Sequence, residues 1–174
     1  MARTVTLVDT AGSPTGIADL LDAHTGKGKL HKAFSVYVFN PKKTAMLIQQ
    51  RSTKKMLWPL IWANTCCSHP YEHEEPQAAG ERRLQEELGF SCKLRMGSSF
   101  VYRAEDPAGK GVEHEHVTIL LGEAKESIPL TPDLDEVAAW KWKKIDELQR
   151  EFEQNPEMYT PWFKLGLKKI LENC

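Results

Sequence analysis

Residues 68–90 read S-x5-E-x7-R-R-L-Q-E-E-L-G-F, and this stretch says more than any other about how the 174-residue chain folds. It begins inside the loop sequence NTCCSHP at residues 64–70 and continues into a segment with helical spacing at residues 76–88. Pro76 suits a first helical turn, and Gly89 is a common residue at a helix end. Gly80 inside the helix costs roughly 1 kcal/mol relative to alanine, so we expect a packing reason for it. The loop and helix together hold a thiol, an imidazole, two arginines and a carboxylate pair, which indicates chemistry in addition to packing.

The composition is that of an ordinary globular protein, with 41% hydrophobic and 27% charged residues. A formal net charge of −1 gives no overall attraction to nucleic acid or anionic lipid, so neither is an expected partner and any basic site must be local. No segment approaches the length of a membrane span, and the polar N-terminal residues predict a strand rather than a signal peptide. The four cysteines form no CxxC spacing, which favours a reducing, cytoplasmic location.

The order of predicted elements indicates an α+β (mixed α/β) fold, with helices flanking a mixed sheet. The patterns predict strands at residues 4–8, 33–39, 45–50, 90–95, 98–103, 116–122 and 137–142. The second and third of these are expected to form a hairpin across the turn at residues 40–43. Helices are predicted at residues 17–23, 76–88, 144–153 and 162–172. No repeat or low-complexity tract divides the chain, so a single domain over residues 1–174 is expected.

Two arginine–glutamate pairs lie on the predicted central helix. Arg82 and Glu86 are four residues apart, as are Arg83 and Glu87, so each pair shares one side of the helix. Taken alone, such pairs favour a solvated amphipathic face and contribute roughly 0.3–0.5 kcal/mol each.

The wider spacing resembles the Nudix box, G-x5-E-x7-R-E-U-x-E-E-x-G-U, in which U is a bulky aliphatic residue and carboxylates hold a divalent metal on a diphosphate. The positions in register are Glu74, Arg82, Leu84, Glu86, Glu87, Gly89 and Phe90. Ser68 replaces the first glycine, and Arg83 replaces the first glutamate of the carboxylate cluster. The exchange of an anion for a cation weakens a hydrolytic multi-metal site and supplies a diphosphate clamp instead. The box therefore indicates a metal–diphosphate ligand, and Arg83 argues against ordinary diphosphate hydrolysis.

A second group of candidate ligands is the sequence Glu113-His114-Glu115-His116. In an extended strand, the two glutamates point to one face and the two histidines to the other. Two carboxylates on one face repel each other unless a cation lies between them, so a metal bound by both and by several histidines is one interpretation. Nitrogen and oxygen donors without thiolate suit Mn²⁺, Zn²⁺ or Mg²⁺. An exposed edge strand with alternating charge is an equally good interpretation of these residues alone. The histidines of the chain are His24, His31, His69, His73, His114 and His116.

Cys67 follows another cysteine and lies two residues before His69. A buried, inert cysteine is the commoner situation, whereas reactivity requires thiolate character or a proton-transfer partner. Trp58 and Trp162 are candidates for the wall of a site as well as for ordinary core packing. A local basic patch that suits phosphate, although such patches are more often only solvated, comprises Arg51, Lys54 and Lys55.

Together these features resemble the type I isopentenyl-diphosphate isomerases, which have the Nudix fold. The resemblance spans residues 4–172, and its most specific parts are NTCCSHP at residues 64–70, EHE at 113–115 and TPWF at 160–163. It implies a Nudix-type fold with an N-terminal extension at residues 1–29 that covers the site, a core at about residues 30–150 and a C-terminal helix at residues 159–172. It also implies metal-dependent, reversible conversion of isopentenyl diphosphate to dimethylallyl diphosphate in isoprenoid precursor biosynthesis.

The resemblance implies a role for each matching residue. A divalent metal, which we expect to be Mn²⁺, Zn²⁺ or Mg²⁺, is held by His24, His31, His69, Glu113 and Glu115. A Mg²⁺ ion on the substrate diphosphate is placed by Glu87, and the diphosphate is bound by Arg51, Lys55 and Arg83. The catalytic set comprises Cys67 and Glu115, the supporting hydroxyl of Tyr102, and Trp162 over the reacting carbons. Cys66 is expected only to pack.

One position departs from the family. Its members often have lysine four residues before the first ligand histidine, where this chain has Leu20. One phosphate contact is therefore missing, or it is supplied by one of the nearby lysines, which are Lys27, Lys29 and Lys32.

Two other functions are compatible with these residues. A Nudix diphosphohydrolase would release phosphate, and Arg83 and the paired cysteines speak against it. A non-catalytic prenyl-diphosphate-binding protein would lack the catalytic side chains, whereas this chain retains all of them. The expected partner is a small prenyl diphosphate, bound by a monomer or homodimer without membrane insertion.

Overall fold

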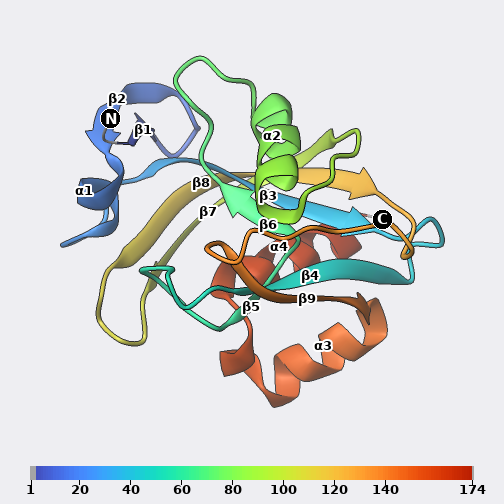
Figure 1. The fold of residues 1–174 in the computed structure, drawn as a ribbon. Helices are drawn as coiled ribbons and strands as arrows, with labels where there is room; N and C mark the ends of the chain where they lie inside the picture. The colour runs from blue at the N-terminus through green and yellow to red at the C-terminus, as the bar shows by residue number, and fades with distance from the viewer. Residues whose placement is uncertain (1–2, 174) are drawn as a thin grey trace.

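The computed structural model describes residues 3–173 of the chain. Within this range nine strands form one mixed sheet, and helices pack against it (Figure 1). In chain order the elements are β1 (Thr4–Val8), β2 (Pro14–Asp19), α1 (Leu20–His24), β3 (His31–Phe39), β4 (Ala45–Arg51), β5 (Trp62–Ala63), β6 (Cys66–Ser68), α2 (Pro76–Leu88), β7 (Arg95–Glu105), β8 (Val112–Glu123), β9 (Val137–Lys144), α3 (Ile145–Gln154), a 3-10 turn (Pro156–Met158) and α4 (Pro161–Glu172).

Strand β3 lies at the centre of the sheet and contributes to both hydrophobic cores. Phe34, Val36 and Val38 point to a core beneath α2, whereas Ala33 and Tyr37 point to a core shared with α4. Successive side chains of a strand point to opposite faces, so an almost continuously apolar sequence fits a strand buried on both sides. Figure 1 shows α2 and α4 on opposite sides of this strand. The architecture is the expected α+β fold, with a mixed sheet between flanking helices.

The neighbours of β3 explain how the sheet is mixed. Strand β8 runs parallel to β3 along its whole length, and β7 extends the sheet beyond β8. On the opposite edge, β3 pairs in turn with β1, β6 and β4, all antiparallel. The predicted hairpin between β3 and β4 is confirmed, but its pairing covers two residue pairs, Val38–Leu47 and Phe39–Met46. Strand β4 then continues along β9, with which it pairs over its length.

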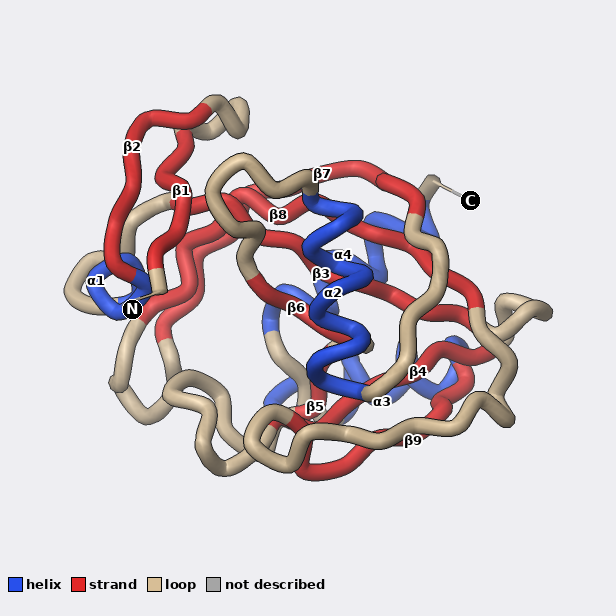
Figure 2. Tube along the Cα trace, turned by 45° about the horizontal axis from the view of Figure 1, so that its top comes forward, coloured by secondary structure: helices blue, strands red, loops and turns tan. Residues whose placement is uncertain are grey.

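The N-terminal segment differs from its predicted structure, because residues 17–19 of the expected helix belong to strand β2. Helix α1 begins after Asp19, whose carboxylate accepts a hydrogen bond from the Leu21 N–H at 2.8 Å and caps the helix. The β1–β2 hairpin joins the main sheet through the pairing of Leu7 with His31. Figure 2 shows the hairpin and α1 together at one end of the sheet. This arrangement brings His24, at the end of α1, to the start of the central strand.

Helix α2 spans the predicted residues, and two glycines shape it. Gly89 adopts a φ of 71° and ends the helix, with its N–H donating to the Gln85 carbonyl. Gly80 faces the sheet, where an added Cβ atom would approach side-chain atoms of Leu120 and Leu94 to 2.6 and 2.7 Å. The expected packing reason for Gly80 is therefore confirmed.

The predicted strand at residues 90–95 is wrong. Phe90 and Leu94 bury their side chains in the core beneath α2, and β7 begins at Arg95. The Leu94 N–H donates to the Glu81 carboxylate at 3.2 Å rather than to a neighbouring strand. The strand at residues 4–8 and the helix at 76–88 have the predicted bounds, and the other predicted strands and helices occur with shifted ends. None of the helices within residues 3–173 has the length and apolar character needed to cross a membrane.

Candidate active site and metal centre

Neighbouring strands bring most of the predicted site residues to one end of the sheet. The parallel register of β3 and β8 sets His31 opposite Glu115, and the antiparallel register of β7 and β8 sets Tyr102 opposite the same glutamate. Strand β6, which pairs with β3, carries Cys67. Glu113 and Glu115 are both buried, and β8 lies between two other strands. The interpretation of residues 113–116 as an exposed edge strand is therefore wrong.

Four side chains form a compact group of potential metal ligands. One ligand atom from each of His24, His31, His69 and Glu115 lies within 4.8 Å of all the others. His69 Nε2 is 3.1 Å from His31 Nε2 and 3.0 Å from Glu115 Oε1. Glu113 adjoins the group, with its Oε2 atom 3.0 Å from His24 Nε2. The structure thus brings together all five residues that the sequence suggested as ligands.

Backbone carbonyls orient two of these imidazoles. His24 Nδ1 lies 2.7 Å from the Leu20 carbonyl oxygen, and His31 Nδ1 lies 2.7 Å from that of Lys29. Because a carbonyl can only accept, each Nδ1 carries the proton and donates it. When such a ring is neutral, its lone pair is therefore on Nε2, the atom that faces the cluster, as in metal-binding histidines.

The cluster fits a divalent metal ion. Facing nitrogen lone pairs repel each other unless a cation or a proton lies between them, and the Glu113 and Glu115 carboxylates lie next to these nitrogens. Ligand atoms about 2.1 Å from an ion and at right angles to each other lie about 3.0 Å apart. The three spacings of 3.0, 3.1 and 3.0 Å match this expected distance, whereas His31 Nε2 and Glu115 Oε1 lie 3.6 Å apart. Nitrogen and oxygen donors without thiolate are consistent with the same ions as before.

Protonation and metal binding are coupled at this site. Burial lowers the pKa of His69 to about 3, so its imidazole is neutral. Burial also acts to lower the pKa of His24, but the Glu113 carboxylate outweighs it and raises the pKa to about 9. His24 therefore holds a proton that a metal would displace, so metal binding at this cluster releases protons.

A cavity of about 230 Å³ adjoins the metal cluster and contains the four predicted catalytic residues, which are Cys67, Tyr102, Glu115 and Trp162. The Tyr102 hydroxyl donates to Glu115 Oε2 at 2.8 Å, which leaves Oε1 facing the histidines. Burial raises the pKa of the Cys67 thiol to about 12, although the Arg51 guanidinium opposes the shift. The thiol is therefore protonated at neutral pH and is suited to proton transfer rather than to nucleophilic attack as a free thiolate.

Trp162 forms an apolar wall of the cavity. It is nearly fully buried and meets Trp58 edge to face, with the ring centroids 5.2 Å apart. The Arg51 guanidinium carbon lies 5.3 Å from the centroid of the Trp162 ring, within cation–π distance. Arg51 is itself fixed by the Leu57 carbonyl, which accepts from its Nη2 at 2.8 Å. The face of Trp162 thus already lies next to a positive charge, that of Arg51, in this structure.

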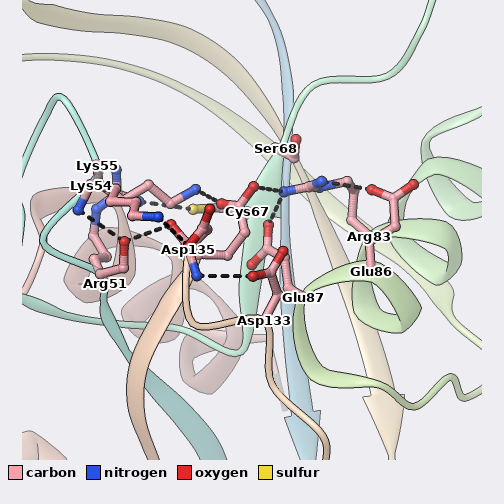
Figure 3. Close-up of polar contacts among 12 residues, drawn as sticks. Arg51, Lys54, Lys55, Cys67, Ser68, Arg83, Glu86, Glu87, Asp133 and Asp135 are labelled. Atoms are coloured by element: carbon pink, nitrogen blue, oxygen red, sulfur yellow. Dashed lines mark hydrogen bonds and ion pairs between the residues drawn. The ribbon is translucent and has the colours of Figure 1, made fainter.

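The predicted diphosphate-binding residues Arg51, Lys55 and Arg83 line the same cavity, and Figure 3 shows polar contacts among them and their neighbours. Arg83 Nη2 is 2.5 Å from Glu87 Oε1 and 3.0 Å from Glu136 Oε1, and its Nη1 is 2.6 Å from Glu86 Oε2. Glu136 also pairs with Lys55. These two cations act against the effect of burial and lower the pKa of Glu136 to about 2. Sequence reasoning did not identify Glu136; its only signal was the acidic run at residues 133–136 before β9.

Glu87 lies outside both the metal cluster and the cavity wall. It is 1% exposed, and it accepts hydrogen bonds from Arg83 and, at 3.0 Å, from Gln49 Nε2. Helix α2 therefore has a solvated side and a buried side. The predicted Arg82–Glu86 pair is confirmed on the solvated side, where Arg82 also bonds Glu74, whereas the Arg83–Glu87 pair is buried.

The remaining histidines stay outside the cluster. His73 is exposed beside Glu72, and His114 and His116 project from the opposite face of β8. Lys27, Lys29 and Lys32, which were candidates for a missing phosphate contact, do not line the cavity. A different cation, Arg3, does line it, and nothing in the local sequence indicated this role.

The comparisons with known proteins agree with this geometry. The NUDIX domain pattern matches residues 29–163. An isopentenyl-diphosphate Delta-isomerase of Nocardia farcinica is 42% identical over 168 residues, which cover 97% of this chain and 92% of the relative. The enzyme of the same name from Halorhodospira halophila is 40% identical over 160 residues, covering 92% of this chain and 90% of the relative. The chain belongs to the isopentenyl-diphosphate isomerase family of Nudix proteins.

Solved structures support the Nudix fold of this family member. A crystal structure of a Deinococcus radiodurans protein aligns with a TM-score of 0.69 at 15% identity, covering 88% of this chain and 90% of the other. A MutT protein from Methanosarcina mazei aligns with a TM-score of 0.64 at 12% identity, covering 83% and 94%. At such identities the likeness concerns the fold alone. The NUDIX match begins at residue 29, so His24 of the metal cluster belongs to a segment that precedes it.

Proposed function

We propose that this isomerase-family chain interconverts isopentenyl diphosphate and dimethylallyl diphosphate, in the formation of isoprenoid precursors. The observation that carries the proposal is a single cavity in which the Cys67 thiol, the Tyr102–Glu115 pair and the Trp162 ring lie together beside a group of cations. The near full-length similarity to isopentenyl-diphosphate Delta-isomerases supports the same activity.

The reaction requires two proton transfers at adjacent carbons. An alkene is a weak base, so its protonation needs a positioned acid and a stabilised tertiary carbocation. One of Cys67 and Glu115 adds a proton to the terminal carbon of the double bond, and the other removes a proton from the allylic carbon. The double bond moves by one position, no atom is gained or lost, and the two roles exchange in the reverse direction. Tyr102 holds the Glu115 carboxylate in place, and the Trp162 face stabilises the positive charge by about 2 kcal/mol in a dry site.

The metal set in this proposal is a divalent ion, Mn²⁺, Zn²⁺ or Mg²⁺, held by His24, His31, His69, Glu113 and Glu115. When bound, such an ion would fix the Glu115 carboxylate and adjust its basicity. Glu87 is proposed to help place Mg²⁺ on the substrate diphosphate. This role requires a Glu87 oxygen to exchange its present partner, Arg83 or Gln49, for the ion.

The diphosphate is proposed to bind to Arg51, Lys55 and Arg83 along the cavity wall. A five-carbon hydrocarbon has little surface for binding. The binding free energy of the diphosphate group therefore holds the reacting carbons near Cys67 and Trp162. Arg83 stands where the Nudix box has a glutamate, so one carboxylate of a hydrolytic metal site is absent, which argues against cleavage of the phosphoanhydride bond.

The distinguishing experiment follows isopentenyl diphosphate by ¹H and ³¹P NMR with the metal-loaded protein. Isomerisation gives dimethylallyl diphosphate with both phosphorus signals retained, whereas a diphosphohydrolase gives free phosphate and a monophosphate. Exhaustive chelation should abolish the conversion, and unchanged rates after chelation would contradict the metal cluster. A protein that binds the substrate without converting it would instead be a non-catalytic binder.

The proposed location is the cytoplasm, and the proposed assembly is a monomer or homodimer. The cysteines at positions 66, 67 and 92 are free thiols, which supports a reducing compartment. Size-exclusion chromatography with light scattering measures the assembly directly.

A further inference from the structure

The cations of the cavity differ in how far protein anions already neutralise them. Arg83 contacts the carboxylates of Glu86, Glu87 and Glu136, and Lys55 pairs with Glu136. Arg3 lines the same cavity, and none of the ion pairs formed by residues 3–173 includes it. Its guanidinium instead donates from Nη2 to the Ser68 hydroxyl at 2.6 Å.

The environment of Arg3 favours the binding of an anion. Burial, and then the positive charge of Arg83, lower the pKa of Arg3, although the guanidinium stays protonated at any physiological pH. A partly buried cation next to a second cation is unfavourable in the free protein and becomes favourable when an anion enters between them. Ser68 ends strand β6 between Cys67 and His69, so its hydrogen bond holds the Arg3 guanidinium next to these site residues.

The backbone places Arg3 beside the one position where this chain departs from its family. The Leu20 N–H donates to the Arg3 carbonyl at 2.8 Å, so the two residues are neighbours just beyond the end of the β1–β2 ladder. Leu20 lines the cavity with an apolar side chain, where the family often has lysine. The side chain that brings charge to this corner of the cavity is therefore that of Arg3.

We propose that Arg3 is a diphosphate-binding residue that supplies, from the position directly before strand β1, the cation missing at position 20. The inference rests on the proposed function for the identity of the substrate, but the binding of a diphosphate anion to Arg3 does not depend on catalysis. An arginine offers a planar, two-pronged donor where a lysine would offer a single ammonium, so it can contact two oxygens of one phosphate group. The extension at residues 3–24 thereby contributes to both ends of the site, with Arg3 for the diphosphate and His24 for the metal.

The test uses the full-length, metal-loaded protein, with Arg3→Gln as the main variant and Arg150→Gln as a matched control. Arg150 is an exposed arginine on α3 outside the cavity. Calorimetry measures the Kd for inorganic pyrophosphate with Mg²⁺, and initial rates give KM and kcat for isopentenyl diphosphate. We expect Arg3→Gln to raise both Kd and KM about tenfold, as for the loss of one charge-assisted contact, and to change kcat less than about threefold.

Two further variants protect the test against misfolding. Arg3→Lys keeps the charge but loses the two-pronged donor, so its Kd should lie between those of the parent protein and Arg3→Gln. The double variant Arg3→Gln/Leu20→Lys should recover most of the lost affinity, because it returns a cation to the neighbouring position. Unchanged Kd and KM in Arg3→Gln, or a double variant no better than the single one, would overturn the proposal. If the parent protein binds pyrophosphate but does not isomerise the substrate, the proposed function fails while the role of Arg3 is still decided by the Kd values.

Discussion

Replacing Arg83 by methionine should destabilise the protein far more than the same change at its neighbour Arg82. Arg83 is 8% exposed and is the cationic partner of Glu87, which is 1% exposed. Removing one partner of a buried ion pair leaves an uncompensated charge and typically costs about 3–5 kcal/mol. Arg82 lies on the solvated side of α2 with Glu74 and Glu86, so its loss should cost about 1 kcal/mol.

The assay is urea unfolding followed by circular dichroism, with a double-mutant cycle. Glu87→Gln in the Arg83→Met background removes the unpaired charge, and we expect it to restore about 2 kcal/mol of the free energy of unfolding. The hydrogen bond from Gln49 can then be re-formed with the new amide oxygen. Equal destabilisation by Arg82→Met and Arg83→Met, or additive effects of the Arg83 and Glu87 changes, would refute the view that Arg83 compensates a buried carboxylate.

Three further outcomes follow from the site. Cys67→Ala should lower kcat at least about 10³-fold with the fold intact. Cys66 lies in the core beneath α2, so Cys66→Ala should keep activity and lower the free energy of unfolding by roughly 1 kcal/mol. Equal losses of activity would contradict the assignment of Cys67 as the proton-transfer group. Tyr102→Phe should lower kcat about 10- to 100-fold with little change in KM, because it removes the hydrogen bond to Glu115, and a change in KM alone would argue against this role. Glu136, whose pKa falls to about 2 on folding, should stabilise the protein fully above pH 5 and progressively less as the pH drops towards 2. The difference in free energy of unfolding between the parent protein and Glu136→Gln, about 2 kcal/mol at neutral pH after solvent screening, should therefore disappear on acidification. A difference that does not change with pH would exclude the ion pairs as its source.

The features that could be predicted from sequence are those with a local pattern. The spacing of Arg82, Arg83, Glu86 and Glu87 predicted the helix and both of its ion pairs, and the alternation at residues 113–116 predicted that two carboxylates share a face. Periodicity carries this information because side-chain direction repeats with a fixed period in each type of element. It does not reveal whether a face is solvated, so the burial of Glu87 and of residues 113 and 115 required the tertiary structure.

The features that were missed depend on contacts between distant segments. Arg3 reaches the cavity because β1 pairs with β2 and β3, and Glu136 reaches Arg83 because its loop docks on α2, where the Asp133 N–H donates to the Glu87 carbonyl at 3.0 Å. The helix expected at residues 17–23 begins three residues later than predicted for the same reason, since pairing with β1 places residues 17–19 in β2. Such pairings override local propensity and leave no periodic signal within either segment.

The most direct test of the account is deuterium incorporation during turnover of isopentenyl diphosphate in D₂O, followed by ¹H and ²H NMR. The account holds that Cys67 and Glu115 exchange protons with solvent between turnovers, and that one of them delivers its proton to the terminal carbon while the other removes a proton from the allylic carbon. It predicts dimethylallyl diphosphate with deuterium in the methyl group, and no deuterated product with Cys67→Ala. Product that forms without solvent deuterium, or release of phosphate in place of the isomer, would contradict it.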